Sequence, residues 1–436
     1  MSDAVGVVGM WHLGCSIAAA WLTLGRRVQA VEFDHTVAAA LAQGHAPLFE
    51  PGLDDVLTKG LSSGHLSVAT TAETLKDCDV VFIAYDTPVD DRDASDVGPI
   101  ERAIDAIAPH LARNAIVVVS AQMPVGTCRM LRARLQRIRP DAELAYSPEN
   151  LRLGESIKCY LQPGHIVVGA ETAAVHSHLA SLFEPMNATI FAMSLPSAEM
   201  VKHGINSFLA TSVTLANQWS DIADAYGADF DDIAAALRAD PRIGGRAYIS
   251  PGIGFSGGTL GRDLRVLSTA SATVMGDTAP LFSQVWEYNA SRASLVARRI
   301  ASVVADGGVV ALLGMTYKPG TSTLRRSLPL AIAAELCAGG VQCRAFDPRA
   351  DWETVELPKG LQIATSVADA LRGASLVVVL TEWPEFREID FEAAARAMQS
   401  ARLLDPKRFL SPQRGSLIDA GFEIVPLVSD VSAVAT

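Results

Sequence analysis

The chain has 436 residues, of which 49% are hydrophobic and 19% charged, and a formal net charge of −12. This length exceeds one ordinary core and indicates two or three domains, and the negative charge argues against nucleic acid as a general partner. Six cysteines without a CxxC pair or zinc-ligand spacing predict reduced thiols, a cytoplasmic location and no metal. We see no signal peptide and no apolar run long enough to span a bilayer, so we expect no membrane partner.

The first residues predict a dinucleotide-binding fold. An apolar strand at Ala4–Val8 precedes the glycine turn Gly9-Met-Trp-His-Leu-Gly14, an alanine-rich helix over Cys15–Leu24 and a strand over Val28–Asp34. Such a turn places a pyrophosphate at a helix N-terminus, where unpaired N–H groups and the helix dipole favour an anion. Glu32 would accept hydrogen bonds from the adenosine ribose, and an acid there disfavours a 2′-phosphate, which predicts NAD rather than NADP. The predicted cofactor contacts in the turn are Gly9, Trp11, His12, Leu13 and Gly14.

The glycine motif is imperfect, because Trp11 replaces the usual middle glycine. A doubly wound domain that binds no dinucleotide therefore stays open as an alternative. Further buried strands are predicted at Asp79–Ala84, Ile116–Val119 and Ile166–Gly169, and Leu144–Glu149 is predicted as a strand that runs into a loop. Strand ends face the ligand crevice in open α/β sheets, which makes Thr87 and Pro88 candidate cofactor contacts.

Helical character dominates after Pro196. A long helix is predicted over 198–226, and it places Lys202 and Asn206 on one face, one turn apart. A second helix is predicted over Phe230–Ala239, and a helical region runs from Arg265 to about Ala305.

Between these helices lies the stretch Ser250–Asp263, which contains five glycines. Glycine lets the backbone approach a ligand closely and take left-handed turns, so we predict a substrate loop with Thr259, Arg262 and Asp263 as its polar groups. An ordinary surface loop is the alternative.

The last third of the chain restarts the α/β pattern. A strand over Gly308–Leu313 leads into the glycine-rich turn Gly314–Gly320, and a helix over Leu328–Ala338 follows. Later strands are predicted at 341–347, 376–381 and 403–405. We therefore predict an α/β protein in which two Rossmann-like doubly wound domains, 1–193 and 301–436, are joined by a central helical region, 194–300, to which the family resemblance described below assigns dimerisation.

In order and spacing, these landmarks resemble the UDP-glucose/GDP-mannose dehydrogenase family over nearly the whole chain. The matching features are the glycine turn with Glu32, Pro47–Leu53, Thr87-Pro88, Pro124–Thr127, Ser147-Pro-Glu149, Glu199 with Lys202 and Asn206, Arg242-Ile243, Pro251–Asp263, Gly314–Gly320 with Arg325 and Ser327, Asp347-Pro348, and Thr381-Glu-Trp383. The resemblance implies an NAD-dependent oxidoreductase that oxidises the C6 alcohol of a nucleotide sugar to an acid in two hydride transfers.

The resemblance also assigns roles. It places Lys202, Asn206, Asp263 and Glu149 among the catalytic residues, with Thr259 at the position of the family's nucleophilic cysteine. Gln122, where a threonine is usual, and Arg325 join the cofactor contacts. The implied substrate contacts are Leu151, Arg242, Tyr248, Gly254, Phe255 and Lys318. Arg242 resembles an arginine that reaches across a subunit interface to the diphosphate, which implies a homodimer with a shared substrate site.

The departures from the family concentrate in the chemistry. Thr259 replaces the cysteine, Arg262 replaces a lysine, Leu153 falls where some relatives carry a second glutamate, and Cys159 and His165 replace an aspartate and an arginine. Three hypotheses follow: an NAD-dependent alcohol oxidation that stops after one hydride transfer, a full four-electron oxidation without a cysteine, and a non-catalytic homologue that binds NAD or a nucleotide sugar.

Overall fold

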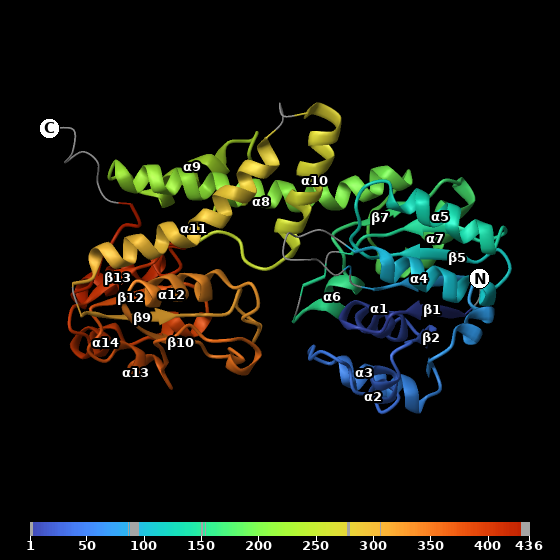
Figure 1. The fold of residues 1–436 in the computed structure, drawn as a ribbon, viewed down its shortest axis with the longest axis horizontal. Helices are drawn as coiled ribbons and strands as arrows, with labels where there is room; N and C mark the ends of the chain where they lie inside the picture. Colours follow the sequence, from blue (N-terminus) through green and yellow to red (C-terminus); the bar gives the residue numbers. More distant parts are fainter. Residues whose placement is uncertain are drawn as a thin grey trace. The chain divides into compact units, whose positions relative to one another are not determined.

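The structure is a computed structural model that describes residues 3–85, 87, 96–149, 151–152, 154–276, 280–305 and 307–428. These residues form two compact units, 1–205 and 206–436. Figure 1 labels their helices and strands. Among the described residues, no helix is both long and apolar enough to cross a membrane.

The N-terminal unit is built on one eight-stranded sheet with the strand order β3-β2-β1-β4-β5-β6-β7-β8. All neighbouring strands run parallel except β6 and β7, which are antiparallel. The strands are β1 (Ala4–Val8), β2 (Arg27–Val31), β3 (Leu66–Ala69), β4 (Val80–Ile83), β5 (Ile116–Val119), β6 (Glu143–Tyr146), β7 (Ile166–Gly169) and β8 (Ile190–Met193). Four of them, β1, β4, β5 and β7, are apolar runs of four or five buried residues, as expected for strands covered on both faces.

Helices cover both faces of this sheet. One core lies between the sheet and α1 (His12–Thr23), α3 (Leu53–Ser62), α6 (Ser156–Leu161) and α7 (Ala173–Phe183). The other core packs α4 (Gly98–Ile107), α5 (Thr127–Ile138) and the start of α8 (Leu195–Ala225) against the opposite face. A short helix, α2 (His35–Leu41), follows β2. The unit is therefore doubly wound, and parallel strands of such a sheet end at one crevice.

The C-terminal unit contains a second, six-stranded parallel sheet with the order β11-β10-β9-β12-β13-β14. Its strands are β9 (Val309–Leu313), β10 (Gln342–Phe346), β11 (Leu361–Ile363), β12 (Leu376–Val379), β13 (Arg402–Leu404) and β14 (Glu423–Ile424). Figure 1 shows α11 (Leu281–Val303) and α12 (Leu328–Ala338) on one face, and α13 (Val367–Leu371) and α14 (Phe391–Ala397) on the other. The short α15 (Arg414–Asp419) packs with the second pair.

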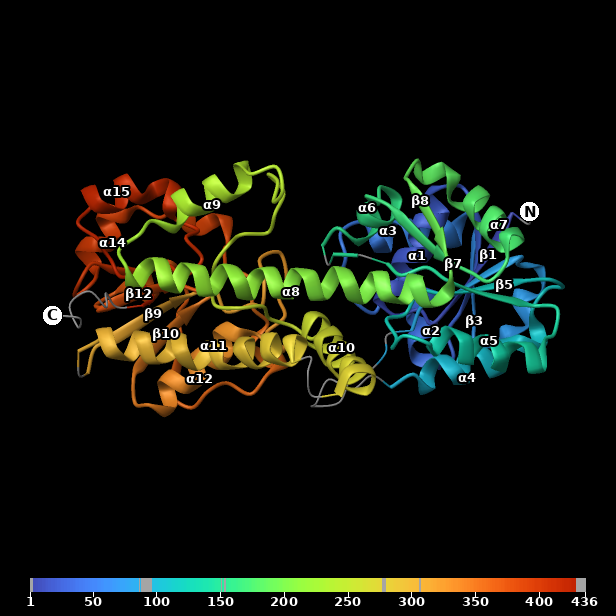
Figure 2. The same ribbon diagram turned by 90° about the horizontal axis from the view of Figure 1, so that it is seen from above.

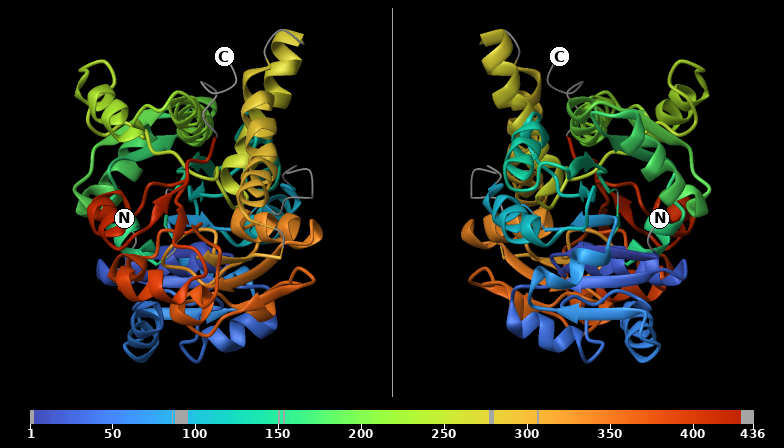
Figure 3. Two further views of the ribbon diagram at one scale, coloured as in Figure 1. Left: turned by 90° about the vertical axis from the view of Figure 1, so that its left-hand side faces the viewer. Right: turned by 90° about the vertical axis from the view of Figure 1, so that its right-hand side faces the viewer.

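The helical middle of the chain consists of α8, α9 (Phe230–Ala239), α10 (Thr259–Met275) and α11. Helix α8 is one continuous helix of 31 residues, which Figure 2 shows without a break. Within the C-terminal unit, α10 and the start of α11 extend side by side away from the sheet of that unit, as the end-on views of Figure 3 show.

The structure corrects two expectations about this middle region. The stretch 250–263 is a loop only as far as Gly258, because α10 begins at Thr259 and carries both Thr259 and Asp263. The region predicted as helical from Arg265 to about Ala305 is two helices, of which the second begins at Leu281 after Pro280. In addition, strands β3, β8, β11 and β14 were not predicted from the sequence, and each is short and only partly buried.

Candidate active site

The first glycine turn has a backbone that favours glycine. Gly9 takes the left-handed conformation, with φ +86°, and its N–H donates to Val31 O at 3.0 Å. At Gly14, in the first turn of α1, a Cβ atom would lie 1.9 Å from Gly9 O. Because no side chain fits there, the helix N-terminus approaches the turn as closely as a bound pyrophosphate requires.

The acid predicted at the end of the second strand lies beside this turn. Glu32 directly follows β2 and is 7% exposed. Its Oε2 accepts from Met10 N at 2.7 Å, and its Oε1 accepts from Asp34 N at 3.0 Å. A carboxylate has about four lone-pair positions, so Glu32 retains acceptor capacity for a ribose hydroxyl.

The remaining residues of the turn differ in exposure. Trp11 is 47% exposed, whereas Leu13 is buried. His12 is the first residue of α1, and its Nε2 lies 3.0 Å from Glu50 Oε2. Sequence reasoning did not nominate Glu50, although it lies inside the matched stretch 47–53.

Two further nominated residues meet at neighbouring strand ends. Thr87 Oγ1 donates to the backbone oxygen of Gln122 at 2.6 Å, after β4 and β5 respectively. Thr87 is 4% exposed. The predicted contact Pro88 lies outside the described residues.

Glu149 and Lys202 also come together within the N-terminal unit. The Lys202 ammonium donates to the backbone oxygen of Glu149 at 2.5 Å, and Lys202 is 7% exposed. The Glu149 carboxylate is turned to its own loop, where Oε2 accepts from Leu151 N at 2.5 Å. The contact between the two catalytic candidates is therefore made by the glutamate's main chain.

The C-terminal unit holds the other pair of catalytic candidates. Asn206 Nδ2 donates to Asp263 Oδ2 at 2.5 Å, and the two residues are 7% and 0% exposed. Asn206 comes from α8 and Asp263 from the second turn of α10. Along α8, Lys202 and Asn206 are separated by four residues, which is one helical turn.

Side chains from α8 and α11 hold the first half of the substrate loop. The Gly252 N–H donates to Asn217 Oδ1 at 2.7 Å, and Arg292 Nη2 donates to Gly252 O at 2.9 Å. Asn289 pairs with both main-chain groups of Phe255, at 2.8 Å and 3.0 Å. At Gly254, φ is +104° and a Cβ atom would lie 2.6 Å from Asn289 Oδ1.

Sequence reasoning missed Asn217, Asn289 and Arg292. Arg292 is 1% exposed and forms a two-armed ion pair with Asp221 on α8. A buried arginine is costly unless paired, so this pair fixes the two helices that carry the loop. No motif in the sequence distinguishes these positions from other polar residues of a helix.

The second half of the loop and the neighbouring substrate candidates are more open. Thr259 is exposed and begins α10. Tyr248 is 50% exposed, and the Arg242 side chain is 89% exposed and pairs with Asp240 at 2.6 Å. Phe255 packs against a small apolar cluster that includes Leu264.

The second glycine turn lies at the end of β9. Gly314 has φ +86°, and its N–H donates to Phe346 O at 2.8 Å. Asp347 follows β10, is 7% exposed and accepts six hydrogen bonds. The donors are Met315 N, Thr316 N, Thr316 Oγ1 and Trp383 Nε1 to Oδ2, and Arg349 N and Ala350 N to Oδ1.

One nominated residue, Lys318, lies in this turn, and another, Arg325, follows it. Lys318 is half-buried, with its ammonium 5.7 Å from the centre of the Tyr317 ring. Arg325 is exposed. Both lie in the C-terminal unit, whereas the other nominated cofactor contacts lie in the N-terminal unit.

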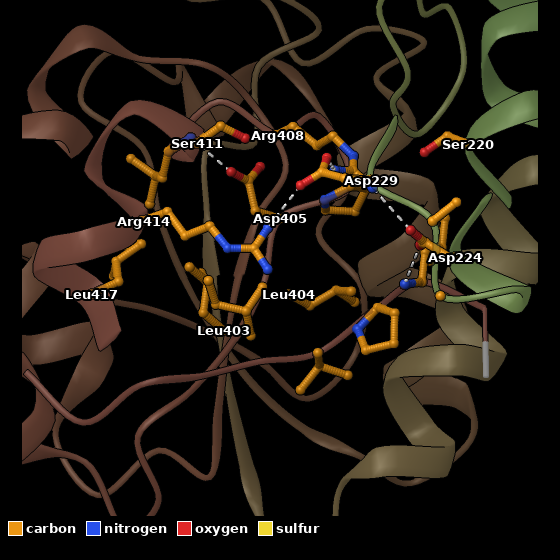
Figure 4. Close-up of a pocket in the computed structure, with 18 residues that line it drawn as sticks. Ser220, Asp224, Asp229, Leu403, Leu404, Asp405, Arg408, Ser411, Arg414 and Leu417 are labelled. Carbon is orange, nitrogen blue, oxygen red and sulfur yellow. Dashed lines mark hydrogen bonds and ion pairs between the residues drawn. The ribbon is translucent and has the colours of Figure 1, made fainter. Parts of the chain in front are cut away.

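Each unit also contains a hollow. One of about 330 Å³ in the N-terminal unit is lined by Glu149, Leu151, Cys159 and His165, among others. The other, of about 380 Å³, lies in the C-terminal unit and contains none of the nominated residues. Figure 4 shows Arg414 and Asp229 facing each other across this second hollow, with their charged atoms 3.6 Å apart. Burial raises the pKa of Asp405, which lines the same hollow, to about 6. Because no nominated residue lines this second hollow, we place the candidate chemistry outside it.

Comparison with known proteins decides the family. Three domain models of one family match in chain order: the NAD-binding domain over 3–187, the central domain over 196–291 and the UDP-binding domain over 311–412. The chain belongs to the UDP-glucose/GDP-mannose dehydrogenase family. It is therefore an NAD-dependent dehydrogenase of the class that acts on CH–OH groups, and the family resemblance, the fold class and the cofactor predicted from the sequence are confirmed.

Relatives match this family member over almost its whole length. UDP-glucose 6-dehydrogenase YwqF of Bacillus subtilis is 29% identical over 409 residues, which cover 92% of each chain. UDP-glucose 6-dehydrogenase AglM of Haloferax volcanii is 29% identical over 94% of this chain and 98% of the relative. The structure of a UDP-glucose dehydrogenase from Pyrobaculum islandicum matches with a TM-score of 0.82 and 26% identity, over 93% of this chain and 94% of the other.

Proposed function

We propose that this chain oxidises an alcohol of a nucleotide sugar with NAD and stops after one hydride transfer. The observation that carries the proposal is the pairing of buried Asp263 with Asn206, together with a buried Lys202, where Thr259 supplies no thiol. This set can serve a proton abstraction. It lacks the nucleophile that a second oxidation through a thioester requires.

The residues of the first glycine turn fit NAD. The left-handed Gly9, the side-chain-free approach at Gly14 and the remaining acceptor positions of Glu32 match a pyrophosphate and an adenosine ribose without a 2′-phosphate. NAD, when bound, accepts the hydride from the carbon that bears the alcohol. Thr87 and Gln122 would line the same crevice, since they follow adjacent parallel strands.

Lys202, Asn206 and Asp263 would handle the proton. The Asp263 carboxylate can take the hydroxyl proton, and the amide of Asn206 holds that carboxylate in one orientation. The Lys202 ammonium, held by the Glu149 carbonyl, can stabilise the alkoxide charge that develops on the sugar oxygen. Glu149 would position Lys202 through its main chain and bind water through its carboxylate.

Thr259 decides where the reaction stops. A thiol has a pKa of about 8.5 and is partly ionised near neutral pH, whereas an aliphatic hydroxyl needs a dedicated base to attack a carbonyl. Thr259 is exposed at the start of α10. We propose that the aldehyde or ketone leaves as the product.

The test is the NADH yield per sugar at limiting UDP-glucose, GDP-mannose and N-acetylated UDP-hexosamines. We expect one NADH per sugar, two NADH in the Thr259→Cys variant, and one in the matched Thr259→Ser variant. Two NADH from the unchanged protein would overturn the proposal in favour of the four-electron reaction. Unchanged turnover in Lys202→Ala would exclude the assigned role of that lysine.

We also propose a homodimer, which α8 supports within the C-terminal unit. Phe208, Leu215 and Ile222 repeat every seven residues along the helix and are 69%, 42% and 57% exposed. Such a seven-residue apolar stripe suits pairing with a second helix. We expect light scattering to report a dimer, a monomer for Phe208→Glu, and a dimer for the control Ser62→Glu on α3. A dimeric Phe208→Glu would exclude this face.

The partner copy would then bring the exposed Arg242 to the diphosphate, as the family resemblance implies. Leu151, Tyr248, Gly254, Phe255 and Lys318 would complete the substrate contacts, and Arg325 those of the cofactor. We place the reaction in the cytoplasm, where NAD is available and the six free thiols stay reduced.

A further inference from the structure

A buried carboxylate outside the assigned chemistry joins two loops of the N-terminal unit. The Glu50 side chain is 2% exposed, although Glu50 lies in a turn before α3. Its Oε1 accepts from Ser156 N at 2.7 Å, and its Oε2 accepts from Gly154 N at 3.0 Å. The ring nitrogen Nε2 of His12 lies 3.0 Å from the same Oε2.

The carboxylate is ionised in this position. Burial acts to raise the pKa of Glu50, but the hydrogen bonds from Ser156 N, His12 and Gly154 N together bring that pKa below its usual value. A buried charge is stable only where such partners are fixed in place. The three partners must therefore stay close together for as long as Glu50 is buried.

The partners of Glu50 come from two parts of the unit that the proposed reaction must hold close together, the glycine turn and the Glu149 loop. His12 begins α1 directly after the glycine turn, and Gly154 and Ser156 follow the Glu149 loop and start α6. A second buried contact runs in parallel, since Ser16 Oγ of α1 lies 2.8 Å from Ser156 Oγ. Both serines are fully buried.

We propose that Glu50 is a positioning residue that locks the dinucleotide turn to the loop carrying Glu149. Glu50 acts through His12 on one side and through Gly154 and Ser156 on the other, so it fixes the distance between the cofactor site and the group that holds Lys202. This inference rests on the proposed function for its catalytic consequence and on geometry alone for the lock itself.

The test compares Glu50→Gln with a matched acid on the same element. Glutamine keeps the shape but turns an NH₂ group toward a backbone N–H, so we expect at least fivefold faster hydrogen exchange over 154–161. We expect kcat to fall about 10- to 100-fold, the loss typical of a displacement of about 1 Å, while KM for the sugar changes less than threefold. Asp55→Asn, exposed in the first turn of α3, should leave the exchange rate, kcat and KM unchanged.

A second variant covers the case in which Glu50→Gln does not fold. His12→Phe removes one partner and leaves the two backbone donors, so faster exchange confined to 154–161 is expected again. The inference is overturned if exchange over 154–161 stays at the wild-type rate, or if it rises equally across the whole unit. If the unchanged protein oxidises no sugar, the proposed function fails on that result, and the exchange measurements still decide the role of Glu50.

Discussion

The chain contains the same strand–turn–helix–strand unit twice, and the two copies use their acids differently. Gly9 and Gly314 have the same φ of +86°, and each donates to the last residue of the next strand, Val31 or Phe346. In each copy the residue after the glycine is a methionine, whose N–H donates at 2.7 Å to the acid that follows that strand.

The difference lies in how many donors each acid satisfies. Glu32 receives two backbone N–H groups, one on each oxygen. Asp347 receives six donors, including the indole of Trp383. A carboxylate has about four lone-pair positions. Glu32 can therefore still accept a ligand hydroxyl, whereas Asp347 is saturated by its own chain. One backbone motif thus leaves acceptor positions for a ligand in the first unit and forms a fixed scaffold in the second.

The largest effect is expected from Asp347→Ala. The substitution leaves several buried donors unpaired, each of which costs about 1–3 kcal/mol of stability. Water can satisfy some of them, so we expect the free energy of unfolding to fall by an amount on the order of 4 kcal/mol. Hydrogen exchange should accelerate in β9 and β10 and stay unchanged in β1 and β2. Equal exchange in the two sheets would contradict the assignment of Asp347 as a scaffold.

Alanine in place of each glycine should separate the two turns next. At Gly314 a Cβ atom would lie 2.6 Å from Thr381 Cβ and 2.7 Å from Thr381 N, whereas at Gly9 its nearest neighbours would be atoms of the Tyr85 ring, at 3.0 Å. Both variants carry the strain of a left-handed backbone, but a side-chain ring can move aside and a backbone cannot. We therefore expect the free energy of unfolding to fall by about 3 kcal/mol in Gly314→Ala and by about 1 kcal/mol in Gly9→Ala. Chemical denaturation of both variants, followed by exchange in each sheet, measures this order, and the reverse order would refute it.

Glu32→Gln should weaken NAD binding, because glutamine removes the charged acceptor. Hydrogen bonds to a charged acceptor contribute about 1.5–3 kcal/mol, so we expect the Kd for NAD to rise about 10- to 100-fold. Calorimetric titration of NAD measures the change, with Asp55→Asn as the control. An unchanged Kd would mean that Glu32 only stabilises its turn, as Asp347 does.

The smallest effect is expected from Trp383→Phe, which removes one of the six donors to Asp347 at 3.1 Å. The loss of one neutral donor, while Asp347 keeps its other partners, should lower the free energy of unfolding by about 1 kcal/mol. Thermal unfolding of the purified variant, with Trp352→Phe as the comparison, reports the loss. A loss as large as that of Asp347→Ala would show that the indole, not the acid, organises the turn.

Much of the fold was predictable because its elements are local. The apolar runs of β1, β4 and β5 contain no polar residue, and the glycines and the acids that follow them lie within one βαβ unit. Strands β3 and β8 escaped prediction, since Ser67 interrupts one and the other is a half-exposed edge strand. The start of α10 was missed because Gly257 and Gly258 suppress the helical pattern just before Thr259.

Candidate site residues could be nominated from the sequence where they carry the family's spacing, and not where their partners are distant in sequence. The chain places Glu50 beside Gly154 and Ser156 across 104 and 106 residues, and Asn289 beside Phe255 across 34. Such contacts depend on how helices pack. No periodicity in the sequence indicates them, so Glu50, Asn289 and Arg292 required coordinates.

The predicted substrate loop is held unevenly along its length, and this bears on which of its positions tolerate substitution. Gly252, Gly254 and Phe255 are tied to Asn217, Asn289 and Arg292. Thr259 is exposed and begins a new helix. Substitutions in the tied half disrupt several helices at once, whereas those in the open half cost little stability. Residue 259 can therefore change while the fold is kept, so a different side chain can be introduced there by a single mutation.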